Sequence, residues 1–183
     1  LEPVENKKET ILLFAAADCT GHGVPGAIMS ILNISSIEEA VKEGSTTPHD
    51  IFNKARKFII ERLKKDGSVE GGKDGMDASI ICFNADKTKM TYTAAQNPIW
   101  VIRAGEVIQI KAEKMPVGKH DNDHIPFEGG EFDLQKGDIV YTLTDGFQDQ
   151  FGPDCSPRPQ DGVDHRCRIL GLLLPVVDPG LPG

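Results

Sequence analysis

The stretch from Ile11 to Ala27 reads ILLFAAADCTGHGVPGA, and it combines three local signals in one place. It opens with seven apolar residues, 11–17, a short continuous run that favours a buried strand. The run ends at Asp18, and a glycine-rich turn at residues 21–26 follows. The stretch therefore predicts a buried strand that leads through a tight turn into a helix, with a carboxylate at the carboxyl end of the strand.

Two helices are predicted after this turn. From Ala27 to Val41 apolar residues recur three or four positions apart, which is a helical spacing, and Gly44 is a natural stop. The second helix begins with Thr47 as its cap and Pro48 at its first position. Its inner face is predicted to consist of Ile51, Ala55, Phe58, Ile59 and Leu63.

After Gly75 the apolar period changes to two, which indicates strands. The predicted strands come in pairs joined by short turns: 79–83 with 90–93, 99–102 with 107–110, and 131–134 with 138–143. Two helices amid many short strands are typical of the α+β class, with helices packed on the face of a largely antiparallel sheet system.

The overall composition limits the class of protein. A chain of 183 residues with 39% hydrophobic and 26% charged residues is typical of one globular domain. Its net charge of −8 argues against nucleic acid as the main partner. No apolar run approaches the ~20 residues that span a bilayer, so direct membrane insertion is not expected. No secretory leader opens the chain and its four cysteines lack a C-x-x-C spacing, so a cytoplasmic location is expected.

The composition changes near Gly152. The last part of the chain, 153–183, holds six of the 12 prolines and no lysine. It is either a Pro-rich terminal arm or out-of-frame or foreign sequence, and we favour the second interpretation. Because proline interrupts helices and strand ladders, we predict a domain over residues 1–152 and an irregular tail over 153–183.

Two motifs suggest sites that their context does not support. Gly21, Gly23 and Gly26 match the G-x-G-x-x-G fingerprint of dinucleotide binding, but that fingerprint requires a parallel strand–helix–strand unit. Here a second helix and then hairpins follow the first helix. His120 and His124 have a zinc-like H-x₃-H spacing, but they lie in a polar loop without cysteine partners. Neither nucleotide nor zinc binding is therefore expected.

Asp18 and Asp145 each follow a predicted strand directly or within a few residues. Strand ends can hold two carboxylates close together, and carboxylates with backbone carbonyls suit hard cations such as Mg²⁺ or Mn²⁺. The alternative is that each aspartate only caps the next helix or turn. Spacing alone leaves both interpretations open.

Several segments resemble, in order, the motifs of SpoIIE-type serine/threonine phosphatases, which belong to the PPM or protein phosphatase 2C-like superfamily. They are residues 17–27 (D-x-x-G-H-G), 74–79, 94–98 (A-G-H-N-P, with Gln96 where His is usual), 115–118 (P-L-G) and 144–146 (T-D-G). The resemblance covers about residues 10–152. It implies two stacked antiparallel sheets flanked by helices.

The resemblance also implies a two-metal Mn²⁺ or Mg²⁺ centre, in which a metal-activated water hydrolyses phosphoserine or phosphothreonine without a protein nucleophile. By position Asp18 and Asp145 would be metal ligands, and Cys19 would offer its backbone carbonyl. The family's remaining metal aspartates lie in an upstream G-D-F/Y-Y-D-like strand and in a D-D near the C-terminus, and neither has a match here. We therefore expect a domain that is incomplete at both ends and weak or inactive by itself.

In such a family the expected partner is a phosphorylated regulatory protein of bacterial signalling, and a sensor or repeat region is expected upstream in the full-length protein. The alternative is a pseudophosphatase, a signalling module that keeps the fold but binds without hydrolysis.

Overall fold

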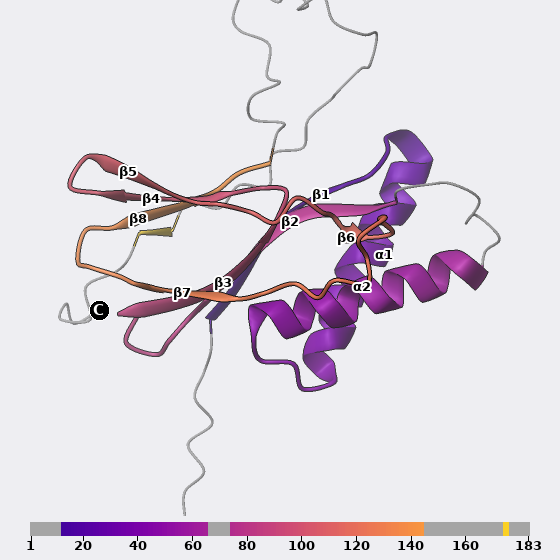
Figure 1. Cartoon of the computed structure of the whole chain (residues 1–183), viewed down its shortest axis with the longest axis horizontal. Coiled ribbons are helices and arrows are strands. Elements are labelled where there is room, and N and C mark those ends of the chain that lie inside the picture. Colours follow the sequence, from indigo (N-terminus) through magenta and orange to yellow (C-terminus); the bar gives the residue numbers. More distant parts are fainter. Residues whose placement is uncertain (1–11, 66–73, 145–173, 176–183) are drawn as a thin grey trace, which may run out of the picture.

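The structure, a computed structural model, describes residues 12–65, 74–144 and 174–175, and it contains two antiparallel sheets stacked face to face (Figure 1). The first sheet has the order β1-β2-β3-β7, with β6 also paired to β2. The second has the order β5-β4-β8-β9. The predicted α+β class with two stacked antiparallel sheets is therefore confirmed.

The elements have the following bounds. The first sheet contains β1 (Leu12–Cys19), β2 (Gly75–Phe83), β3 (Lys89–Ala95), β6 (Val117–Gly118) and β7 (Gly130–Asp133). The second contains β4 (Ile99–Arg103), β5 (Glu106–Ile110), β8 (Ile139–Thr142) and β9 (Leu174–Pro175). The helices are α1 (Gly23–Lys42) and α2 (Pro48–Lys65). Neither helix of the described part is long and apolar enough to cross a membrane.

Strand β2 is the centre of the first sheet, and it begins four residues earlier than its alternating pattern predicts. Gly75 and Met76 pair with β6 on one side, and Met76 also pairs with Cys19 at the end of β1. Because β2 is buried on both faces along nearly its whole length, this part of the strand needs no alternation of apolar and polar residues. The extension of β2 brings its first residues beside the end of β1.

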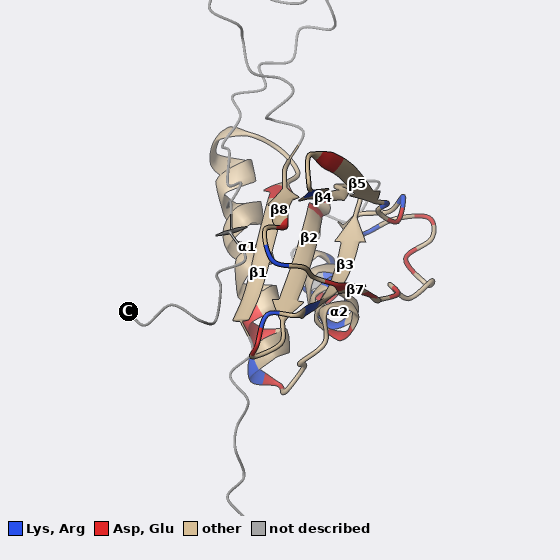
Figure 2. Ribbon diagram, turned by 90° about the vertical axis from the view of Figure 1, so that its left-hand side faces the viewer, with Lys and Arg blue, Asp and Glu red and all other residues tan. Residues whose placement is uncertain are grey.

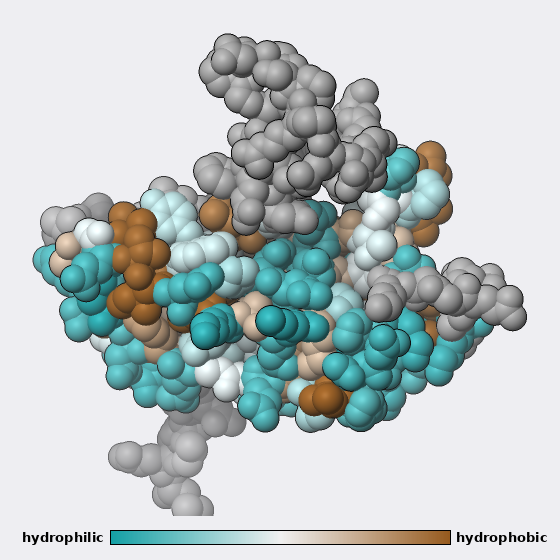
Figure 3. All heavy atoms as spheres, turned by 45° about the horizontal axis from the view of Figure 1, so that its top comes forward, coloured by the Kyte–Doolittle hydropathy of each residue, from teal (hydrophilic) through white to brown (hydrophobic). Residues whose placement is uncertain are grey.

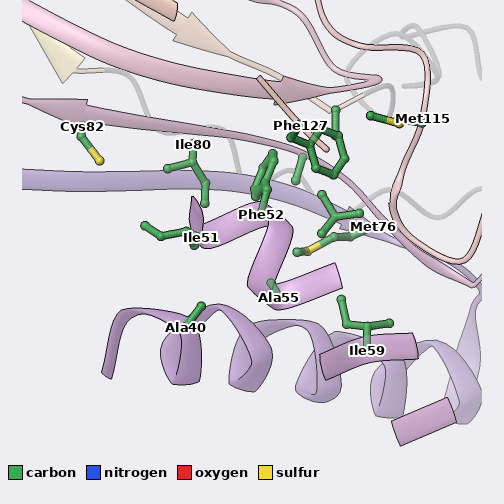
Figure 4. Packing of buried hydrophobic residues seen from close by; sticks show 13 residues of the cluster. Ala40, Ile51, Phe52, Ala55, Ile59, Met76, Ile80, Cys82, Met115 and Phe127 are labelled. Carbon is green, nitrogen blue, oxygen red and sulfur yellow. The ribbon is translucent and has the colours of Figure 1, made fainter. Parts of the chain in front are cut away.

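Helix α2 covers the first sheet as predicted. Ile51, Ala55 and Ile59 are fully buried in a core cluster with residues of β2, and Phe58 and Leu63 pack against it (Figure 4). Phe52 meets Phe127 edge to face, with ring centroids 5.4 Å apart. Burial of each such side chain contributes about 1.5–3 kcal/mol, so this cluster is a main source of the fold's stability.

Helix α1 turns a different face inward from the one its apolar spacing suggests. Val24, Ile31 and Ile34 are 74%, 69% and 56% exposed, and Figure 3 shows apolar surface over the start of this helix. Its buried positions are mostly small or polar, namely Gly26, Asn33, Ser36 and Ala40, with Met29 as the large apolar side chain among them. These short side chains let α1 approach β1 and α2 closely. Polar contacts then hold it, because Arg62 of α2 donates to Ser36 Oγ and pairs with Glu39.

A second core cluster fills the space between the sheets. Ile81, Phe83 and Met90 of the first sheet contact residues of the second, among them Ile99, Val101 and Val140. In Figure 2 the strands that enclose this cluster are largely uncharged, and the charged residues gather on the turns and edges. Asp138, in the turn that precedes β8, is nevertheless buried: it is 2% exposed and forms a two-pronged ion pair with Arg103.

Part of the predicted tail is ordered. Leu174 and Pro175 pair with Val140 and Ile139 on the open side of β8, which differs from the prediction of an irregular segment over 153–183. Proline occurs in such edge strands at positions whose backbone N faces away from the neighbouring strand, where no ladder bond is required. The rest of this segment lies outside the described residues, so the domain boundary near Gly152 stays a prediction.

Candidate metal site at one end of the sandwich

The end of β1 brings two carboxylates face to face. The antiparallel pairing of β1 with β2 places Asp77 directly opposite Asp18, and both residues are half-buried. Directly opposed residues in such a ladder lie on the same face of the sheet, with Cβ atoms about 4.5–5.5 Å apart. Asp18 and Asp77 therefore form one acidic pair.

This pair lies on the face of the first sheet that is turned toward the second sheet. Alternate residues of a strand share a face. Phe14 on β1 and Ile81 on β2 belong to the cluster between the sheets, and each is four residues from an aspartate of the pair. Ala17 and Ala78, in the intervening positions, pack toward the helices instead. The two carboxylates thus lie at the end of the space between the two sheets.

The second sheet reaches the same end of the sandwich. The Nδ2 of Asn97, in the turn from β3 to β4, donates a 3.1 Å hydrogen bond to the backbone oxygen of Asp77. Ile99, which opens β4, pairs with Thr142, which closes β8. The chain then continues through Thr144 to Asp145. Asp145 itself lies outside the described residues, so its place beside Asp18 stays a prediction.

Further oxygen donors lie along the strand faces that carry these residues. Ser79 follows Asp77 by two positions and Thr144 follows Thr142 by two, and both side chains are buried. Neither Ser79 Oγ nor Thr144 Oγ1 has a hydrogen-bond partner among the described residues. Carboxylate and hydroxyl oxygens are suitable ligands for Mg²⁺ or Mn²⁺, so the donor types fit such an ion. Within 12–65 and 74–144, however, no three His, Cys, Asp or Glu side chains gather as a metal cluster.

The carbonyl of Gly75 ties the elements around this pair together. It accepts hydrogen bonds from the backbone N of Thr20 (3.0 Å), from Thr20 Oγ1 (3.1 Å) and from Nδ2 of the fully buried Asn33 (3.0 Å). The end of β1, the middle of α1 and the start of β2 thus meet at one oxygen. This junction fixes the backbone on either side of the Asp18–Asp77 pair.

The glycine-rich turn has a structural role, because the backbone at this end of the molecule requires glycine. Gly21 has a φ of 95°, and a Cβ on Gly26 would lie 2.5 Å from the carbonyl oxygen of Gly21. The turn therefore needs glycine for its own close approach. Since α1 leads into α2 and then into antiparallel strands, the parallel unit that dinucleotide binding requires is not formed among the described residues.

The other predicted site residues lie as follows. Cys19 packs its side chain toward the helices, so its thiol is on the opposite face of the sheet from Asp18, and its proposed carbonyl role stays a prediction. The Nδ1 of His120 accepts a hydrogen bond from the backbone N of Asn122 in an exposed loop. His120 and His124 are thus part of a polar loop, as expected.

Asp77 is the residue of this site to which the motifs assign no role. Its signal in the sequence is a single acidic residue inside the otherwise uncharged stretch from Gly75 to Phe83. Only the register with β1 shows that it faces Asp18. Asn33 has no comparable signal in the sequence, because only the structure shows that it lies on the buried side of α1.

Comparisons with solved structures agree with this architecture. The SiaA-PP2C domain of Pseudomonas aeruginosa superposes with a TM-score of 0.64 and 26% identity, over 75% of this chain and 52% of that one. The PP2C phosphatase domain of SpoIIE from Bacillus subtilis, with a fragment of its regulatory domain, gives 0.59 and 18%, over 81% and 40%. The catalytic domain of the serine/threonine phosphatase PstP, with two manganese ions, gives 0.55 and 14%, over 82% and 76%.

The chain thus spans about half of the SiaA domain and less than half of the SpoIIE structure. A search of curated proteins finds no match. The sequence model of the family described as stage II sporulation protein E (SpoIIE) matches residues 8–169. With a fold shared with PP2C-type phosphatase domains, and with most of its length matched, the chain belongs to the SpoIIE family.

Proposed function

We propose that this chain is a metal-dependent phosphatase domain that hydrolyses phosphoserine or phosphothreonine on a regulatory signalling protein. The observation that carries the proposal is the Asp18–Asp77 pair at the end of the inter-sheet space, in a chain of the SpoIIE family. The likeness of its fold to PP2C-type phosphatase domains supports the reaction class.

The proposed ion is Mn²⁺ or Mg²⁺. Asp18 and Asp77 would hold it, with Asp145 as a further carboxylate and the backbone carbonyl of Cys19 as a neutral ligand. All of these are oxygen donors, as hard divalent cations require. The PstP structure that resembles this chain contains two manganese ions, which supports the choice of metal. When bound, such ions lower the pKa of a coordinated water and neutralise phosphoryl oxygens.

The protein's own contribution is to hold and orient the ligands. Two carboxylates on neighbouring strands repel one another, so a cation between them lowers the cost of keeping them together. The Gly75 junction keeps the end of β1 and the start of β2 in register through Thr20 and Asn33. A rigid surrounding of this kind keeps the site near its productive geometry.

Partner and location follow from the same proposal. The substrate would be a phosphorylated regulatory protein in the cytoplasm, and a sensor or repeat region would precede the domain in the full-length protein. The net charge of −8 is in keeping with a protein substrate rather than a nucleic acid.

The test is phosphate release from a phosphoserine peptide by the purified 183-residue chain, with Mn²⁺, with Mg²⁺ and with EDTA. We expect slow release, well below the ~10 s⁻¹ of a median enzyme, that requires the metal and disappears in Asp18→Asn. Asp50→Asn, an exposed carboxylate on α2, is the matched control and should release phosphate at the wild-type rate.

Three outcomes are informative. Release that persists in EDTA or in Asp18→Asn would contradict the proposed site. Metal-dependent binding of the phosphopeptide without any release would support the pseudophosphatase alternative. Robust turnover would support the phosphatase and contradict the expectation that this chain is weak by itself.

A further inference from the structure

A cavity of about 430 Å³ lies between α2 and the loop from Lys119 to Pro126. Its size falls in the range of about 300–1,000 Å³ that is usual for small-molecule sites. The loop begins next to the metal-site end, because Gly118 pairs with Gly75 and the backbone N of Lys119 donates to the carbonyl oxygen of Asp74. None of the site residues discussed above contributes to this cavity except His124.

A buried cation forms part of the cavity wall. Arg56 of α2 is 4% exposed, and its guanidinium stacks over the ring of Phe127 at 3.8 Å. Its Nη1 donates to the carbonyl oxygens of Asp123 (3.1 Å) and Ile125 (2.6 Å). Its Nε and Nη2 have no hydrogen-bond partner among the described residues. The side of the guanidinium that most often holds an oxyanion with two parallel bonds is therefore not used by the protein.

The charges around the cavity are mostly positive. Arg56, Lys57, Lys64 and Lys119 oppose two carboxylates, Glu61 and Asp123, which leaves +2 with His124 neutral. Asp123 is already paired with Lys119 Nζ at 2.7 Å. This local excess of positive charge contrasts with the net charge of −8 for the whole chain. Burial also lowers the pKa of Arg56 against the opposing effect of Glu113 and Asp123, so its charge is desolvated.

We propose that this cavity binds a dianionic oxyanion such as a phosphate group. Lys57 and Lys64 are both exposed and lie two turns apart on one face of α2. They would contact the anion directly. Arg56 would act from the wall through its charge, since its Nε and Nη2 are covered in this structure. Glu113 and Asp123 already offset part of this charge, and a bound anion would stabilise the buried cation further. The site does not depend on the proposed phosphatase activity.

The test is a ¹H–¹⁵N NMR titration of the metal-free, desalted chain with inorganic phosphate and, separately, with a phosphoserine peptide. We expect saturable shifts of Lys57, Lys64 and Lys119 with a Kd of about 1 mM or below for at least one probe. The double variant K57Q/K64Q should weaken binding at least about tenfold, which is about 1.4 kcal/mol. The double variant K42Q/K111Q removes the same charge from exposed lysines outside the cavity and should change the Kd less than about twofold.

The two probes distinguish the source of the anion. Tighter binding of the peptide indicates a phosphorylated side chain of a protein, and equal binding indicates a free phosphate group. Absence of saturation by either probe up to about 20 mM would overturn the proposal. It would also be overturned if K42Q/K111Q weakened binding as much as K57Q/K64Q. Because no metal is present, neither result bears on the proposed phosphatase.

Discussion

Asp77 lies directly opposite Asp18 in the β1–β2 ladder, on the face turned toward the second sheet. This relationship joins two segments that are more than fifty residues apart in the sequence. It depends on the strand register, since a slip of one residue would turn one of the aspartates toward the helices. The register is in turn fixed by the contacts of Gly75 with Thr20, Asn33 and β6.

The first prediction concerns this junction. A Cβ on Gly75 would lie 2.6 Å from the carbonyl oxygen of Val117, so Gly75→Ala should force β2 and β6 apart. We expect a loss of about 1–3 kcal/mol in the free energy of unfolding, measured by urea denaturation. Gly129→Ala is the matched control, because its Cβ would meet only the movable side chain of His49, and it should cost clearly less. Equal losses would show that the close approach at Gly75 is not needed.

The second prediction is a pH dependence of stability. Hydrogen bonds from Arg103 hold the pKa of the buried Asp138 below its usual value. A depressed pKa means that the ion pair stabilises the fold above the unfolded carboxyl's pKa of about 3.9 and that this contribution is lost as the pH falls through the lower, folded value. Asp138→Asn should destabilise the fold at pH 7, because it removes the charge that accepts two hydrogen bonds from Arg103.

The measurement is the free energy of unfolding of wild type and Asp138→Asn, obtained by urea denaturation at pH values from 7 to 2. The difference in the free energy of unfolding between the two proteins should stay constant down to about pH 5 and shrink below about pH 4. A difference that grows on acidification would reverse the sign and refute the assignment.

How much of this structure the sequence could predict differs from element to element. The inner face of α2 followed from its spacing, since residues such as Ile51 and Ile59 pack on a flat sheet where apolar area decides burial. The same reasoning on α1 did not identify its buried side. There the close approach to β1 favours Gly26, Asn33 and Ser36, and Ile28, Ile31 and Ile34 remain outside.

The candidate site, too, could be predicted only in part from the sequence. Asp18 was recognisable because a strand and a glycine turn frame it within a few residues. Asp77 was not, because its role depends on pairing with a distant strand, and a local pattern carries no information on register. The cavity beside Arg56 was equally hidden, since it needs α2 and the 119–126 loop to meet.

The third prediction concerns thiol reactivity. Burial raises the pKa of the Cys82 thiol to about 11, so almost none of it is thiolate at pH 8. Cys82 should stay unmodified by iodoacetamide in the native chain and react once urea is added, as followed by peptide mass spectrometry. Cys19, which is half-buried at the end of β1, should be modified first of the two. Rapid native labelling of Cys82 would mean that the core around β2 opens readily.

The fourth prediction concerns the segment from 153 onward. If it is foreign to the fold, trypsin should cleave early after Arg166 or Arg168, both of which lie outside the described residues; Arg158 precedes a proline, so trypsin does not cleave after it. The arginines of the body, at 56, 62 and 103, should be cleaved later, because they lie in helices and strands. The family match extends to residue 169 and β9 pairs with β8, so equal resistance at Arg166 and Arg168 would place this segment within the domain.

The most direct test of the central claim, that Asp18 and Asp77 hold one divalent cation, is Mn²⁺ binding measured by electron paramagnetic resonance of the free ion. We predict that wild type binds Mn²⁺, that Asp77→Asn and Asp18→Asn each weaken binding at least about tenfold, and that Asp50→Asn leaves it unchanged. Wild-type affinity in Asp77→Asn would contradict the account, because the carboxylate that the β1–β2 register places opposite Asp18 would then take no part in the site.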